Sequence, residues 1–92
     1  MKRENLKEAI RVDKKIIALE KEKEQYQILL RRNKKNNDTI ELRLKQPAAS
    51  AAELLLSTHS DRMKPCVIYC VEYIIAEINS EIHDQITILE HL

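Results

Sequence analysis

Apolar side chains recur every three or four positions along two long stretches of the chain, which is the spacing of amphipathic helices. Over residues 3–32 they form a narrow seam beside a charged face. Over residues 62–90 they surround the helix almost completely between positions 66 and 78 and then narrow to a stripe. Pro65 fits only the first turn of the second stretch, and no Gly interrupts either one. The pattern therefore predicts two long helices.

Between these stretches the apolar period changes from helical to alternating. Residues 39–45 place Ile40, Leu42 and Leu44 on one face, which is typical of a short half-buried strand. The pattern shows no second strand, and a single strand leaves backbone groups unpaired. We therefore expect two copies of the chain to pair through this segment.

Polar clusters mark the bends of a chain that contains no Gly. Asn36, Asn37 and Asp38 end the first helix, because Asn and Asp tolerate the left-handed backbone region that Gly usually occupies. After a bend at Pro47, the capping box that begins at Ser50 predicts a short helix over residues 50–57.

Together these elements predict an all-α fold, with a single domain over residues 1–92. We expect an antiparallel hairpin of the two long helices, with a short connecting strand and a short helix. Apolar side chains that one hairpin leaves over predict a homo-oligomer. Its expected interface lies on the strand and the second helix, at Ile40, Leu42, Leu44, Ile68, Val71, Ile75, Ile78 and Ile82.

The net charge of +1 conceals a marked asymmetry along the chain. Residues 1–45 hold 14 basic and 8 acidic side chains, whereas residues 46–92 hold 2 and 7. Either the two halves attract each other as solvated faces, or the basic half binds an anionic partner. The anion-binding candidates lie around the connector, because Arg and Lys donate charge-assisted hydrogen bonds to phosphate. They are Arg31, Arg32, Lys35, Arg43, Lys45, His59, Ser60 and Arg62.

Neighbouring residues extend both parts of this basic region. Lys34 and the amides of Asn36 and Asn37 belong to the first cluster, which ends the first helix. Lys64 belongs to the second cluster, beside the predicted start of the last helix.

Candidate catalytic chemistry is sparse. The absence of Gly excludes Gly-rich phosphate loops, the dinucleotide fingerprint and the glycine nucleophile elbow. Ser57, His59, Ser60 and Asp61 crowd one loop, but residues adjacent in sequence rarely form a nucleophile, base and orienting group in space. We interpret them as a polar turn, and we expect neither an enzyme, nor a metal site, nor a cofactor.

The cysteines and the N-terminal residues indicate the cellular compartment in which the protein is expected. Cys66 and Cys70 lie four positions apart, where a disulfide within one helical turn would be strained. We therefore expect two buried thiols in a reducing compartment. The charged N-terminus lacks the apolar core of a signal peptide, and the longest apolar run is too short to span a bilayer. These features predict a cytoplasmic protein without a membrane partner.

Residues 38–78 resemble ribbon-helix-helix DNA-binding proteins in their alternating strand, Pro47, predicted short helix, polar turn and apolar helix. The resemblance implies that the strand pairs with that of a dimer mate. Glu41, Arg43 and Lys45 would then face the major groove. The long helix that precedes the strand has no counterpart in that family.

The whole chain resembles small uncharacterised helix–strand–helix proteins of bacteriophages and mobile elements, through residues 2–6, 18–21 and 88–90. Some small phage proteins are counter-defence factors that sequester cyclic nucleotide signals or block a host protein. With the basic connector, the resemblance implies a non-enzymatic oligomeric protein in the host cytoplasm that sequesters a small anionic, cyclic nucleotide. The alternatives are a DNA-binding regulator and a coiled-coil scaffold or adaptor that binds another host or phage protein.

Overall fold

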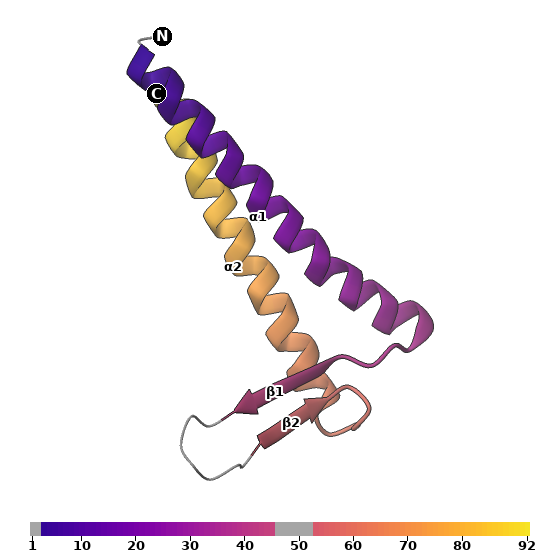
Figure 1. Cartoon of the computed structure of the whole chain (residues 1–92). Coiled ribbons are helices and arrows are strands. Elements are labelled where there is room, and N and C mark those ends of the chain that lie inside the picture. The colour runs from indigo at the N-terminus through magenta and orange to yellow at the C-terminus, as the bar shows by residue number, and fades with distance from the viewer. Residues whose placement is uncertain (1–2, 46–52) are drawn as a thin grey trace. The chain divides into compact units, whose positions relative to one another are not determined.

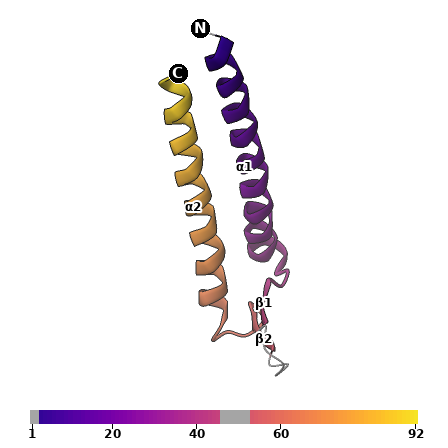
Figure 2. The same cartoon turned by 60° about the vertical axis from the view of Figure 1, so that its left-hand side comes forward.

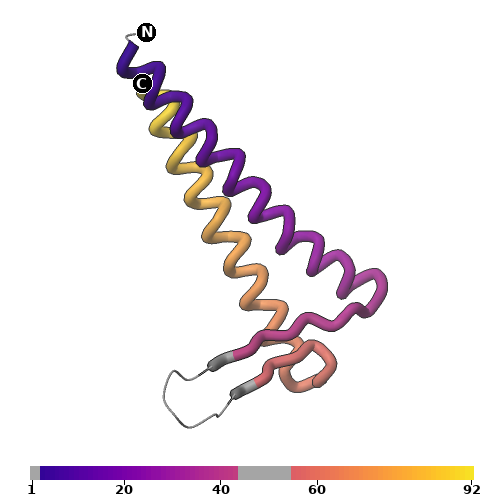
Figure 3. The backbone as a smooth tube through the Cα atoms, viewed as in Figure 1, coloured from indigo at the N-terminus to yellow at the C-terminus, as the bar shows by residue number. Residues whose placement is uncertain are grey.

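A computed structural model describes residues 3–45 and 53–92, except for the side chains of residues 44, 45, 53 and 54 (Figure 1). The predicted bend at Pro47 and the capping Ser50 lie outside the described residues. The described chain is mostly helical with a small two-stranded sheet, as Figure 3 also traces. Its elements are α1 (Arg3–Asn36), β1 (Glu41–Lys45), β2 (Glu53–Ser57) and α2 (Lys64–Glu90).

The chain divides into two compact units. We call the first, Met1–Gln27 with Ile74–Leu92, the helical unit, and the second, Ile28–Tyr73, the sheet unit. Both helices contribute to both units. Helix α1 begins in the helical unit and ends in the sheet unit, and α2 begins in the sheet unit and ends in the helical unit.

The helical unit is an antiparallel helix pair with an apolar core. The start of α1 and the end of α2 lie at the same end of this unit in two views (Figures 1 and 2), as the sequence predicts for a hairpin. At its surface, Lys15 Nζ lies 3.8 Å from Glu81 Oε1. The core side chains come from both helices and follow the predicted three-four spacing: Val12, Ile16, Leu19, Ile78 and Ile82.

Several residues expected at an oligomer interface are buried within the single chain. Ile78 and Ile82 belong to the core of the helical unit, and Ile40 and Val71 are buried in the sheet unit. These four side chains are therefore accounted for without a second copy. The other described candidates, Leu42, Ile68 and Ile75, are half-buried, and the side chain of Leu44 is not described.

The sheet corrects two predictions. Residues 53–57 form strand β2 instead of the end of a short helix, and β2 pairs antiparallel with β1 of the same chain. In the register, Leu42 lies opposite Leu56 and Arg43 opposite Leu55. A short apolar run such as Leu54–Leu56 fits a strand or a helix equally well. Pairing with β1 decides between them, because it satisfies the backbone groups of both segments and removes the need for a second copy.

Helix α1 ends at an Asn cap, as predicted, but it ends four residues later than the predicted boundary at position 32. It continues to Asn36, and Asn37 follows with a positive φ of 58°. The Asn37 N–H donates to the Asn33 carbonyl at 3.1 Å, which is the hydrogen bond of a left-handed helix cap. Asn thus replaces Gly at this cap, because its short polar side chain tolerates the left-handed region.

The apolar segment of α2 is buried on fewer sides than its composition predicts. Tyr69 and Tyr73 are 68% and 55% exposed and stack with ring centroids 6.5 Å apart. Cys66 and Cys70 are free thiols, but Cys66 is exposed and Cys70 half-buried, so the expected pair of buried thiols is wrong. Desolvation raises the pKa of the Cys70 thiol, and the neighbouring Cys66 raises it further. None of the helices within the described residues is long and apolar enough to cross a membrane.

Candidate anion-binding site

Two buried polar side chains hold the sheet unit together. Asn33, in the last turn of α1, is 6% exposed, and Thr58, directly after β2, is 8% exposed. Asn33 Nδ2 donates to the Asp38 carbonyl at 2.8 Å and to Thr58 Oγ1 at 3.2 Å. The end of α1 is thereby tied both to the segment before β1 and to the residue after β2.

The same threonine extends the pairing of the two strands. Its Oγ1 accepts the Ile40 N–H at 2.9 Å, and its own N–H donates to the Ile40 carbonyl at 3.0 Å. Ile40 is itself buried. Thr58 is therefore fixed by three hydrogen bonds to two segments, and its side-chain conformation is tightly constrained.

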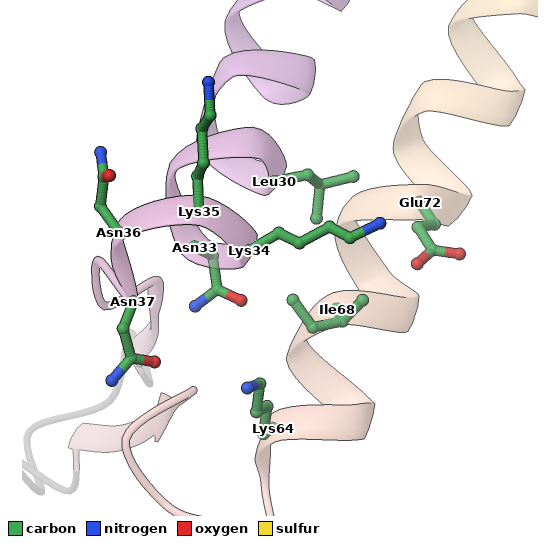
Figure 4. A pocket seen from close by; sticks show the side chains of 9 residues that line it. All are labelled: Leu30, Asn33, Lys34, Lys35, Asn36, Asn37, Lys64, Ile68 and Glu72. Carbon is green, nitrogen blue, oxygen red and sulfur yellow. The ribbon is translucent and has the colours of Figure 1, made fainter.

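This network also fixes the orientation of the Asn33 amide. A backbone carbonyl only accepts hydrogen bonds, so Nδ2 must face Asp38, and Oδ1 must face the other way. No described residue donates a hydrogen bond to Oδ1. In Figure 4 this oxygen points toward the start of α2. Among the described residues no fully buried side-chain oxygen or nitrogen lacks a hydrogen-bond partner, so the Asn33 oxygen is open to solvent and its acceptor capacity is available to a ligand.

The Asn33 oxygen lies at an open pocket of about 700 Å³ (Figure 4). The end of α1 and its cap supply one side, and the first turns of α2 supply the other. Leu30 and Ile68, both half-buried, form its apolar part. The full lining is Leu30, Asn33, Lys34, Lys35, Asn36, Asn37, Lys64, Ile68 and Glu72.

The charge of the lining is predominantly positive. Three ammonium groups, from Lys34, Lys35 and Lys64, outnumber the single carboxylate of Glu72. Lys34 extends from α1 toward Ile68 and Glu72, whereas Lys35 extends along α1 (Figure 4). The pocket thus combines cations, amides and an apolar surface, which suits a small ligand with both an anionic and a ring-shaped part.

The structure brings together parts of both predicted basic clusters. Lys34 and Lys35 come from the first, Lys64 comes from the second, and the amides of Asn36 and Asn37 join them. The sequence contains each residue but no signal that the end of α1 lies beside the start of α2 in this unit. The pocket therefore follows from the folding of the sheet unit.

The eight residues predicted to bind an anion are distributed unevenly. Lys35 lines the large pocket, and His59 lines a smaller pocket beside it. The Ser60 carbonyl accepts the N–H groups of Met63 and Lys64 at 3.0 and 2.8 Å, which forms the turn before α2. The side chain of Lys45 is not described. The four arginines of this predicted set are exposed and line neither pocket: Arg31, Arg32, Arg43 and Arg62.

Three pocket residues were not identified from the sequence as binding candidates. Leu30 and Ile68 have the spacing of ordinary core positions, and Glu72 has that of a solvated helix face. Asn33 lies inside the first basic cluster, between Arg32 and Lys34, but nothing in the sequence distinguishes it from its neighbours. Its burial depends on Thr58, 25 positions later, so no local pattern identifies it.

The loop with the candidate catalytic side chains has the hydrogen bonds of a turn. Ser57 Oγ accepts the backbone N–H of His59 at 3.1 Å. Within residues 3–45 and 53–92, no group of three or more His, Cys, Asp or Glu side chains could hold a metal ion.

Comparison of the chain with known protein families, characterised proteins and solved structures finds no match. The strand arrangement also differs from what the ribbon-helix-helix resemblance implies, because β1 pairs with β2 of its own chain. Arg43 is exposed, and its Nη2 lies 3.9 Å from Oε2 of Glu41, two residues earlier in the same strand. The chemistry of the pocket is therefore the basis for inferring a function.

Proposed function

We propose that the protein is a non-enzymatic binding protein whose large pocket holds a small anionic nucleotide. The observation that carries this proposal is the unused acceptor of Asn33, a residue only 6% exposed, whose oxygen faces a pocket containing both ammonium groups and apolar side chains. A nucleotide has a complementary division into a charged phosphate, a flat ring and ring-edge amino groups. A simple inorganic anion would leave the apolar part of the pocket unused.

Each part of the ligand has a matching group in the lining. Lys34 and Lys64 attract the phosphate from the two sides of the pocket. Leu30 and Ile68 provide an apolar surface for the face of the base. The Asn33 Oδ1 accepts a hydrogen bond from an exocyclic amino group, as Asn does when it recognises adenine.

Binding without turnover gives the protein a defined biochemical effect. A nucleotide held in the pocket is removed from the free pool in proportion to the amount of protein. This is sequestration, the activity implied by the resemblance to small phage counter-defence proteins. It requires no catalytic residue, only protein in sufficient quantity relative to the signal.

Isothermal titration calorimetry against a panel of cyclic and linear nucleotides tests the proposal. We expect Lys64→Ala to weaken binding about tenfold, because a charge-assisted hydrogen bond contributes about 1.5 kcal/mol or more. Lys21→Ala, which removes an exposed lysine of the helical unit, is the matched control and leaves binding unchanged. Absence of heat with every nucleotide, under conditions where the protein is folded, would contradict the proposal.

The role of Asn33 is tested by changing the ligand instead of the protein. Adenosine monophosphate carries the exocyclic amino group that Asn33 Oδ1 accepts, whereas inosine monophosphate carries a carbonyl oxygen there. We expect the adenine compound to bind at least tenfold more tightly, because two facing acceptors cannot form a hydrogen bond. Equal affinity would mean that Asn33 does not contact the base.

A further inference from the structure

A second, smaller pocket of about 180 Å³ adjoins the large one and shares Asn37 and Lys64 with it. This volume corresponds to about six water molecules, which is room for a sugar-sized group but not for a whole nucleotide. Its lining residues all have polar side chains: Asn37, Thr39, Thr58, His59, Asp61 and Lys64. A purine ring would find little apolar surface there.

The best-defined polar group of this pocket is the hydroxyl of Thr58. Both hydrogen bonds to its Oγ1 come from N–H groups, of Asn33 and Ile40, so the oxygen accepts in both. The hydroxyl proton points away from these two donors, and no described residue accepts it. Thr58 is 8% exposed, so this unused donor is nearly buried in the pocket wall.

Asp61 supplies a hydrogen-bond acceptor, which complements the donor hydroxyl of Thr58. Its carboxylate is exposed at the pocket and only accepts hydrogen bonds, so it suits the paired hydroxyls of a sugar. The same negative charge disfavours a phosphate inside this pocket. The Lys64 ammonium, which is shared by both pockets, is therefore the better position for the phosphate.

We infer that the ligand is a nucleotide whose phosphate carries a second, hydroxyl-bearing sugar, and that the small pocket is the subsite for that sugar. This inference rests on the proposed function of the large pocket. The nucleoside occupies the large pocket, the phosphate lies at Lys64 and Asn37 between the pockets, and the second sugar contacts Thr58 and Asp61. The order of pocket types matches the covalent order of such a ligand.

The test compares ADP-ribose, which has a second sugar beyond its phosphates, with ADP, which lacks it. We expect wild-type protein to bind ADP-ribose about tenfold more tightly than ADP in calorimetry, the equivalent of about 1.4 kcal/mol. In Asp61→Asn this ratio falls toward one, because a single neutral amide oxygen replaces the two charged oxygens that accept the paired sugar hydroxyls. Asp84→Asn, at an exposed carboxylate of the helical unit, is the control and keeps the wild-type ratio.

The outcomes separate the inference from the proposed function. If ADP binds and Lys64→Ala weakens it, but ADP-ribose binds no more tightly than ADP, the second-sugar subsite is wrong and the nucleotide pocket stands. If Asp61→Asn changes the affinities for both compounds by the same factor, Asp61 acts only through its charge, and the subsite is again wrong. If no nucleotide binds at all, both proposals fail together.

Discussion

The two units of the chain are stabilised by different kinds of interaction. The helical unit depends on aliphatic side chains that interlock along a regular helical seam. The sheet unit depends on two buried polar side chains, Asn33 and Thr58, whose hydrogen bonds allow only one arrangement. An apolar core tolerates exchange of similar side chains, whereas a buried polar network loses a partner with almost any change. The pockets occur in the unit with the more specific architecture.

Removal of apolar volume from the helical unit should have the largest effect on stability. We expect Ile16→Ala to lower the free energy of unfolding by about 2–5 kcal/mol, because it leaves a cavity in the core. The sheet unit does not contain Ile16, so the nucleotide affinity of the folded fraction stays at the wild-type value. Urea denaturation and calorimetry below the unfolding transition measure the two quantities. A large loss of affinity in folded protein would remove the distinction between the units.

Thr58→Val should produce a smaller loss of stability. It also removes the hydroxyl group that we propose contacts the second sugar. Valine has nearly the same shape but leaves the Ile40 N–H and one Asn33 donor without an acceptor, at a cost of about 1–3 kcal/mol. The control is Thr58→Ser, which keeps the hydroxyl and should retain most of the stability. Urea denaturation distinguishes them, and equal stability of the valine and serine variants would show that the network contributes little.

Substitutions at the helix cap residue Asn37 should have the smallest effect on stability, and the sign of this effect depends on the replacement. Asn37→Gly has two opposite effects on the free energy of unfolding. It removes the backbone strain of the left-handed conformation, which costs about 1–2 kcal/mol. It also makes the unfolded chain more flexible, which lowers stability by about 0.4–1 kcal/mol. We therefore expect a net gain of at most about 1.6 kcal/mol in the free energy of unfolding. Asn37→Ala, which keeps the strain without the polar side chain, should lose stability instead. Thermal unfolding of the three proteins gives the order, and an alanine variant as stable as the glycine variant would contradict it.

The sequence predicts the helical unit much better than the sheet unit. A repeating seam specifies a helix and its buried face, and Asn in a chain without Gly predicts the cap at Asn37. Strand β2 was missed because three consecutive leucines have no period, and its conformation depends on β1. The pocket was missed as a unit because it depends on the contact between Asn33 and Thr58, not on any motif. Self-association and the identity of the ligand stay predictions, the first measurable by light scattering.

The hydrogen bond from the Ile40 N–H to Thr58 Oγ1 makes one amide a reporter of the pocket wall. An amide proton in a sheet is usually held by a backbone carbonyl, and its hydrogen exchange reports the fraying of a strand. Here the proton is released to deuterated solvent only when the threonine side chain separates from Ile40. A ligand that engages the Thr58 hydroxyl slows exchange at Ile40 and leaves the amides of the helical unit unchanged. Occupancy of the small pocket is thus recorded by a single backbone proton.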